Sequence, residues 1–318
     1  MTESKDPSRG RWAAAVFLAG GAASLLPGVS PAVALTGGAL AGLTLGNPFG
    51  ARTKALSKSL LAWSIVGLGA GANLLVVART GLHGIGVTAV SISLTLALGI
   101  LLGRRFGVAP RAALLVSVGT AICGGSAIAA PAPAIGAEDE EVTVALAVVF
   151  LLNAAALFLF PAVGRALHLS QTRFGTWSAL AIHDTSSVVA AGLAYGAKAL
   201  EVGTTLKLTR ALWIVPVTAL LGAQARKKGT GGGAGIKPPW FIAGFVAAAA
   251  VATLVPAVRP EAAWVDWAAK RTLVLTLFLI GSQLTPAALR RAGGRAFGHA
   301  LALWAVVACA TLAAVVLV

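Results

Sequence analysis

Two short polar stretches interrupt apolar segments of this 318-residue chain, and they hold the residue types best suited to chemistry. One is Cys123-Gly124-Gly125-Ser126 and the other is His183-Asp184-Thr185-Ser186-Ser187. Adjacent glycines weaken a helix by about 1 kcal/mol each relative to alanine. Unpaired backbone inside a bilayer is tolerated only where it faces protein or a water-filled cavity. Both stretches therefore predict a buried polar site rather than a plain membrane anchor.

Asp184 is the only acid that we place inside the membrane, and His183 precedes it. A carboxylate at the centre of a bilayer costs about 2.5 kcal/mol or more, so it is a functional candidate by default. A histidine titrates near neutral pH unless its surroundings shift it. We expect the pair to couple transport to protons or to bind substrate. The alternative is a structural role, in which the pair pins helices together with Lys207 or Arg210.

Lys207 and Arg210 lie three residues apart, on one face of the expected helix. They either point inward and attract an anion, or extend their long stems toward the membrane surface. Small hydroxyl and amide side chains flank the helix breaks. Helix N-termini there would suit oxyanions, although such side chains are also routine interhelical donors. The substrate-binding set that we predict is Cys123, Gly124, Gly125, Ser126, Thr185, Ser186, Ser187, Ser282 and Gln283. Asn153, also mid-span, is interpreted as an interhelical hydrogen-bonding residue.

The composition defines the class of protein. Hydrophobic residues make up 58% of the chain and charged residues 11%, against about 25% charged in a typical soluble domain. Long apolar runs predict an all-α integral membrane protein. No P-loop or metal-ligand pattern is present, so we expect no metal, no cofactor and no catalytic residue, and hence a protein that is not an enzyme. The two cysteines imply no disulfide framework.

We count about eleven transmembrane helices, each near the length that a bilayer requires. They are 12–26, 31–46, 59–78, 85–102, 110–136, 142–164, 175–198, 204–223, 239–256, 268–289 and 296–318. Alternate connections carry most of the Lys and Arg residues, and the acidic run 138–141 falls on the other side. The positive-inside rule then places the N-terminus in the cytoplasm and the C-terminus outside, in a bacterial-type inner membrane. The net charge of +15 is thus a topology signal, and no nucleic-acid partner is expected.

Internal similarity suggests inverted repeats with crossed, interrupted helices, which is the pattern of secondary transporters. We pair the Gly125–Ile128 segment with Gly281–Leu284, because those two spans run in opposite directions. A competing match pairs residues 68–81 with 280–293 and implies different repeat boundaries. Residues 182–191 also line up with 122–130, but those two spans are expected to run in the same direction, so we do not treat them as an inverted pair. A single domain over 1–318 then holds repeat 1 at about 31–164 and repeat 2 at about 175–318. The glycine-rich segment 224–238 is predicted to be a flexible loop.

The two polar stretches, followed by Lys207-Leu208-Thr209-Arg210, resemble the YeiH-type sulfate exporter family over nearly the whole chain. Gly125 and Ser187 depart from the family pattern, which often has a small polar residue and Gln at these positions, and this could alter the substrate. The resemblance implies the fold of bile-acid symporters and sodium/proton antiporters, with a panel domain and a core domain. It also implies a sulfate-like substrate.

The residues and the resemblance lead to one expected function and two alternatives. We expect a secondary active transporter of a small inorganic or sulfonated anion, coupled to H⁺ or Na⁺. A passive anion channel would use the same broken helices, and a membrane-embedded enzyme or sensor would use His183 and Asp184. The lipid bilayer is an expected partner, and a homo-oligomer is compatible with the sequence.

Overall fold

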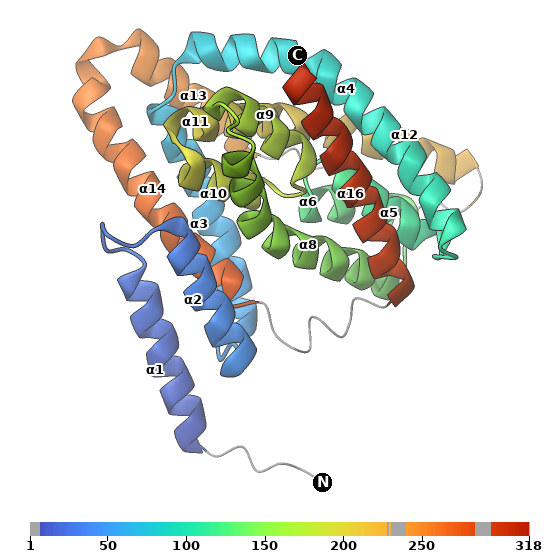
Figure 1. The fold of residues 1–318 in the computed structure, drawn as a ribbon, viewed down its shortest axis with the longest axis horizontal. Coiled ribbons are helices and arrows are strands. Elements are labelled where there is room, and N and C mark those ends of the chain that lie inside the picture. Colours follow the sequence, from blue (N-terminus) through green and yellow to red (C-terminus); the bar gives the residue numbers. More distant parts are fainter. Residues whose placement is uncertain (1–6, 228, 230–239, 284–293, 318) are drawn as a thin grey trace. The chain divides into compact units, whose positions relative to one another are not determined.

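The computed structural model describes residues 7–227, 229, 240–283 and 294–317, and it is helical throughout those ranges, with no strand in them. This confirms the predicted all-α class. The helices are α1 (Pro7–Ala23), α2 (Pro31–Thr44), α3 (Gly50–Ala70), α4 (Leu74–Arg105), α5 (Pro110–Ala121), α6 (Gly125–Ala129), α7 (Pro131–Ala134), α8 (Asp139–Ala166), α9 (Gln171–Ala181), α10 (Thr185–Tyr195), α11 (Ala197–Ala211), α12 (Ile214–Lys227), α13 (Trp240–Leu254), the 3₁₀ helix η1 (Pro256–Val258), α14 (Arg259–Gly281) and α16 (Gly294–Leu317) (Figure 1).

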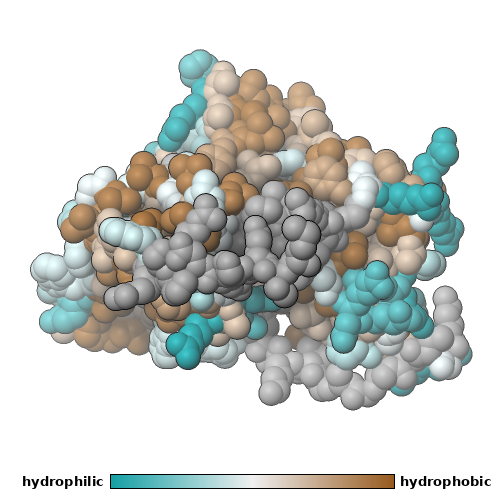
Figure 2. All heavy atoms as spheres, turned by 90° about the horizontal axis from the view of Figure 1, so that it is seen from below, coloured by the Kyte–Doolittle hydropathy of each residue, from teal (hydrophilic) through white to brown (hydrophobic). Residues whose placement is uncertain are grey.

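Several of these helices could cross a membrane. Four are long and apolar enough in the described residues, or up to six if each sharply bent pair counts as one span. Large apolar side chains such as Trp12, Val90 and Leu101 lie on the surface, where lipid would cover them. Apolar residues occupy much of the face drawn in Figure 2. The structure therefore supports a membrane protein, while the expected count of eleven helices is not confirmed.

The chain divides into two compact units. Unit 1 comprises Met1–Leu74 and Phe241–Leu289, and unit 2 comprises Leu75–Trp240 and Arg290–Val318. These units are not the repeats predicted from the sequence, whose boundaries stay a prediction. The predicted flexible loop 224–238 lies outside the described residues except for 224–227, which end α12, and Gly229.

In unit 1, α14 packs closely against α2. Gly38 lies against the carbonyl of Phe278, and Gly281 lies against the carbonyl of Leu35, so a Cβ at either glycine would collide with backbone. Small residues let helix backbones approach in membranes, where dispersion and hydrogen bonds replace the hydrophobic effect as the main attraction. The glycine of the Gly281-Ser282-Gln283 motif therefore has a packing role.

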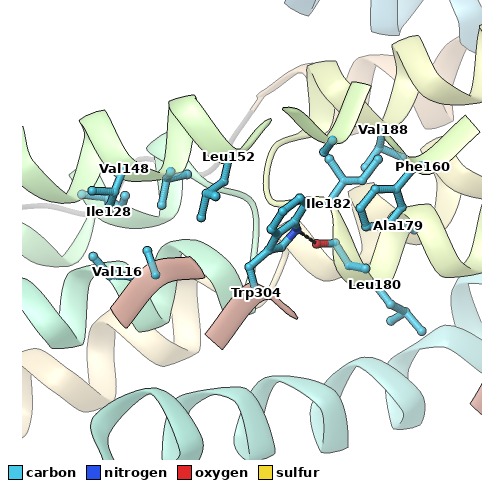
Figure 3. Packing of buried hydrophobic residues seen from close by; sticks show 14 of the residues in the cluster. Val116, Ile128, Val148, Leu152, Phe160, Ala179, Leu180, Ile182, Val188 and Trp304 are labelled. Atoms are coloured by element: carbon cyan, nitrogen blue, oxygen red, sulfur yellow. Dashed lines mark hydrogen bonds between the residues drawn. The ribbon is translucent and has the colours of Figure 1, made fainter. Parts of the chain in front are cut away.

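In unit 2, buried apolar side chains surround two interrupted helices. Phe160 of α8 stacks on Trp177 of α9 with ring centroids 4.2 Å apart, and Trp304 of α16 borders the same ring. Figure 3 shows Trp304 among Ile182, Ala179 and Phe160. This core fixes α9 between α8 and α16 and so positions the polar break that follows α9.

Candidate functional site

Each polar stretch identified in the sequence forms a turn between two helices. Helix α5 ends at Ala121, and α6 begins at Gly125 after the turn 122–124. Ile128 of α6 packs against Gly119 of α5, which a continuous helix would hold about 13 Å away along the axis. The chain therefore folds back, and we call α5, its turn and α6 hairpin 1. The segment 110–136 is therefore interrupted, as predicted, and the parts on either side of the break lie side by side.

The second polar stretch also forms a turn between two helices that fold back on each other. Helix α9 ends at Ala181, and α10 begins at Thr185 after the turn 182–184. The ring of Tyr195, at the end of α10, stacks on Phe174, near the start of α9, with centroids 3.7 Å apart. The two outer ends are thus side by side, and α9 with α10 forms hairpin 2. The segment 175–198, predicted as one span, therefore forms a hairpin of two helices.

Helix α16 shows the direction of hairpin 1. Ala113 and His299 both border Gly103 of α4, while Ser117 and Leu303 both border Gly99. Moving from residue 299 to residue 303 of α16 therefore accompanies a move from the start of α5 toward its turn. Hairpin 1 points along the direction of α16.

Hairpin 2 points the opposite way. The Trp304 indole N–H donates to the Ala181 carbonyl oxygen at 3.1 Å, and the Trp177 indole N–H donates to the Ala308 carbonyl oxygen at 3.0 Å. Moving up α16 from 304 to 308 therefore moves back along α9, away from its turn. The sequence-based statement that these two spans are parallel is wrong. The match of 122–130 with 182–191, set aside as not inverted, is the inverted pair within unit 2.

The structure also places the acidic run 138–141 at a different end of unit 2 from the one expected from the sequence. Val149 of α8 borders Gly119, Asn153 bonds to the turn of hairpin 2, and Gly164 borders Phe174 at the base of hairpin 2. Helix α8 therefore starts at the end of unit 2 where α5 starts. Residues 138–141, which include the first turn of α8, share that end with Arg111 instead of lying opposite to it, because hairpin 1 returns without crossing.

The tips of the hairpins touch. A Cβ on Gly124 would lie 3.0 Å from the Cβ of Asp184, so the two turns are in contact at these residues. Gly124 has φ 69° and ψ −125°, a conformation that side-chain-bearing residues rarely adopt. Glycine is thus needed at this position both for its backbone angles and for the close approach of the second turn.

Asp184 is held by hydrogen bonds that cap α10. Its Oδ1 accepts from the backbone N–H of Ser187 at 2.5 Å, and its Oδ2 accepts from Nδ2 of Asn153 at 3.0 Å. The Oδ1 of Asn153 accepts from the backbone N–H groups of His183 and Asp184 at 3.2 and 3.3 Å. Asn153 of α8 therefore binds both the turn of hairpin 2 and its carboxylate, which agrees with its prediction as an interhelical hydrogen-bonding residue. Its mid-span position was the only sequence signal.

His183 lies deeper than Asp184. Its side chain is fully buried, and neither ring nitrogen has a hydrogen-bond partner among the described residues. Asp184, by contrast, is partly exposed, and Ser126 at the tip of hairpin 1 is exposed. The open side of the junction therefore carries the N-terminal ends of α6 and α10, with Asp184 between them.

Lys207 and Arg210 of α11 lie on the buried side. Both side chains have 0% exposure, which excludes the alternative that they extend to the surface. Lys207 Nζ donates to the carbonyl oxygens of Ile182 at 2.7 Å and Ala179 at 3.3 Å. Neither cation is within 4 Å of a carboxylate in the described residues. Their partners are the carbonyls that end helices, where the helix dipole places partial negative charge.

Ser282 and Gln283 belong to unit 1. Ser282 Oγ accepts from Asn47 Nδ2 at 3.1 Å, and Gln283 Nε2 donates to Ser57 Oγ at 3.1 Å. Every hydrogen-bond partner of these two side chains is in unit 1. The rest of the segment that we paired with Gly125–Ile128, residues 284–293, lies outside the described residues. Their assignment to a common substrate site stays a prediction.

The fold and the site define a helical membrane protein with two oppositely directed helical hairpins whose turns are in contact. The chain belongs to the family described as "Conserved hypothetical protein 698", whose model matches residues 13–300. It is 54% identical over 293 residues to the "UPF0324 membrane protein" of Bdellovibrio bacteriovorus, covering 92% of this chain and 90% of that protein. The corresponding protein of Geobacter sulfurreducens is 49% identical, covering 91% of each chain. No solved structure matches the chain.

Proposed function

We propose that this protein is a secondary active transporter of a small anion, sulfate-like or sulfonate, coupled to H⁺ or Na⁺. The observation that carries the proposal is the contact between two oppositely directed re-entrant hairpins at Gly124 and Asp184. Interrupted helices from inverted repeats, meeting where backbone ends are exposed, are the usual substrate site of secondary transporters. The alternative of an enzyme has no cluster of metal-ligating side chains in the described residues to support it.

The open side of the tips suits an anion. The N-terminus of α10 contributes partial positive charge and backbone N–H groups. Ser126 adds an exposed hydroxyl, and the buried Thr185 and Ser186 add two more at the start of α10. We assign substrate binding to this side, with the remaining predicted residues of the turns, Cys123, Gly125 and Ser187, shaping it.

Asp184 is the coupling residue in this proposal. Its carboxylate already occupies the N-terminus of α10, so it competes with an anion for the same N–H groups. Protonation removes the negative charge and the competition, which would make anion binding depend on a proton. Sodium could act similarly by neutralising the carboxylate, and His183 is the second group able to hold a proton.

A flux assay in proteoliposomes tests the proposal. Purified protein is reconstituted, and uptake of radiolabelled sulfate and of methanesulfonate is followed under an imposed pH gradient or sodium gradient. Saturable uptake that follows one gradient supports coupled transport. Anion currents without saturation identify a channel instead, and no gradient-dependent movement of either anion contradicts the proposal. Empty liposomes and the Asp184→Asn variant are the controls.

The membrane orientation is also proposed. If neither hairpin crosses the membrane, two crossings are lost from the predicted topology, and the losses cancel for the chain ends. The N-terminus then stays cytoplasmic and the C-terminus outside, in the inner membrane of a bacterium. Alkaline phosphatase fused after residue 318 should be active, whereas a fusion at residue 138 should be inactive because the acidic run has moved to the cytoplasmic side.

A further inference from the structure

On the buried side of the junction, the side chain of Arg210 joins the two hairpins. The guanidinium of Arg210 donates to the carbonyl oxygens of Thr120 and Ala121, which end α5, and to those of Ala179 and Leu180, which end α9. The Nη2–Thr120 and Nη1–Ala179 distances are 3.3 and 3.1 Å. Arg210 therefore contacts both hairpins, through carbonyls that are more than fifty residues apart in the sequence.

We propose that Arg210 is a positioning residue that holds the two turns against each other, and that it does not bind the transported anion. Its Nε and both terminal nitrogens already donate to carbonyls, so few of its five N–H groups remain for a ligand. Full burial separates it further from the open side that carries Ser126. Lys207 differs, because both of its partners, Ala179 and Ile182, belong to hairpin 2.

The shape of the guanidinium makes the role specific to arginine. A planar fork presents donors in fixed, divergent directions and can serve two helix ends at once, whereas an ammonium is a compact point charge. Both helix ends carry partial negative charge, so a positive charge is favourable here in either form. A lysine at position 210 would supply the charge without the two-directional contact. This difference separates positioning from simple charge compensation.

The test uses Cys123 as a reporter that needs no substrate. Cys123 lies in the turn of hairpin 1 and is buried, and the other cysteine, Cys309, is exposed and is removed as Cys309→Ser. In this background the rate of labelling by a membrane-permeant maleimide reports separation of the tips. Arg210→Lys should raise the rate on the order of tenfold or more, because the bonds to one hairpin are lost. Lys207→Met should raise it far less.

Arg165→Lys is the matched control, since Arg165 donates to the Ala194 carbonyl oxygen at the outer end of hairpin 2, far from the turn. It should leave Cys123 labelling unchanged. If Arg210→Lys, folded by circular dichroism and gel filtration, labels as slowly as the parent, then charge alone suffices and the proposal is wrong. The same conclusion follows if Lys207→Met matches or exceeds Arg210→Lys.

A measurement on the unaltered protein covers the case in which Arg210 variants do not fold. Hydrogen–deuterium exchange should place the turns 122–124 and 182–184 in one class of protection, because one side chain holds both. A difference of more than about tenfold between them contradicts the proposal. This inference concerns the site of the proposed function, but neither measurement needs transport. If the proteoliposomes show no transport but Cys123 labelling and hydrogen exchange follow the expectations for Arg210, only the proposed transport function is refuted.

Discussion

Hairpin 1 and hairpin 2 reach the same junction by different means. The turn of hairpin 1 depends on backbone conformation: Gly124 has a positive φ, and no side chain caps α6. The turn of hairpin 2 has no positive φ and depends on side chains instead, with Asp184 capping α10 and Asn153 bonding to the turn. The two halves of the inverted pair are alike in topology and different in chemistry.

That difference assigns separate tasks to the two tips. A glycine turn lets the chains approach and leaves backbone N–H groups open, but it cannot change its charge. An aspartate turn can change its charge, and when it does, the cap on α10 changes with it. In the proposed transporter, coupling would therefore belong to hairpin 2, while hairpin 1 would contribute shape.

The substitution Asp184→Asn breaks this asymmetry most directly and has the largest expected effect. It keeps the size and an oxygen acceptor for the Ser187 N–H but removes the titratable charge. Flux driven by a pH or sodium gradient should fall to the background of empty liposomes. The protein should still fold, since N-caps of Asn and Asp are similar in strength.

Asp184→Glu is the control that keeps the negative charge but changes the position of the carboxylate. It retains a carboxylate one methylene further from the turn, so it should keep some gradient dependence at a reduced rate. Undiminished gradient-driven flux in Asp184→Asn would show that coupling lies elsewhere, with His183 the next residue to test.

Gly124→Ala tests the tip that depends on backbone. The new Cβ would meet Asp184 at 3.0 Å, and the backbone angles disfavour any side chain. We expect a loss of about 1–3 kcal/mol in unfolding free energy. Chemical denaturation in detergent measures it. Gly86→Ala is the control, because Gly86 in α4 has open space around it and alanine is the better helix former there. Equal stability of the two variants would mean that the contact between the turns is not specific.

The two turns themselves could be predicted from the sequence. Adjacent glycines at 124 and 125, and a lone aspartate in an apolar segment, are local signals that a helix is interrupted. Their similarity to each other was also visible. What local sequence could not supply was the direction in which the chain leaves each break, because a kinked span and a re-entrant hairpin have similar lengths and hydropathy.

The error in direction then propagated through the counting of spans. It made residues 122–130 and 182–191 appear parallel, moved the acidic run to the wrong end, and favoured a pairing with Gly281. The contacts that settle the direction are Trp304 with Ala181 and Trp177 with Ala308, between segments more than a hundred residues apart. Nothing in the local pattern of the last apolar segment indicates that its one tryptophan, Trp304, contacts hairpin 2.

Asn153→Ala sharpens the comparison by removing the support of one turn only. The variant leaves the backbone N–H groups of His183 and Asp184 without their acceptor and the carboxylate without one donor. A buried unsatisfied group costs about 1–3 kcal/mol, so protection of 182–184 in hydrogen exchange should fall accordingly. Because Arg210 joins the two turns, protection of 122–124 should fall as well. Loss of protection at 182–184 with 122–124 unchanged would show that the turns open separately, and would contradict the role proposed for Arg210.

Trp304→Phe has the smallest expected effect. It tests the contact of α16 with α9 and leaves the residues of the two turns unchanged. The indole N–H donates to the Ala181 carbonyl, the last residue of α9, and the ring lies in the core shown in Figure 3. Phenylalanine keeps most of the apolar contact and loses the hydrogen bond, which predicts a loss of about 1 kcal/mol in unfolding free energy.

The reciprocal substitution Trp177→Phe removes the bond to Ala308 and should cost a similar amount, because both indoles join the same two helices. Each loss acts on hairpin 2 and leaves the glycine turn at Gly124 untouched. If hydrogen exchange instead shows the larger change at 122–124, then α16 supports hairpin 1 more than its contacts indicate. The division of labour between a tip that depends on backbone and a tip that depends on side chains would then have to be abandoned.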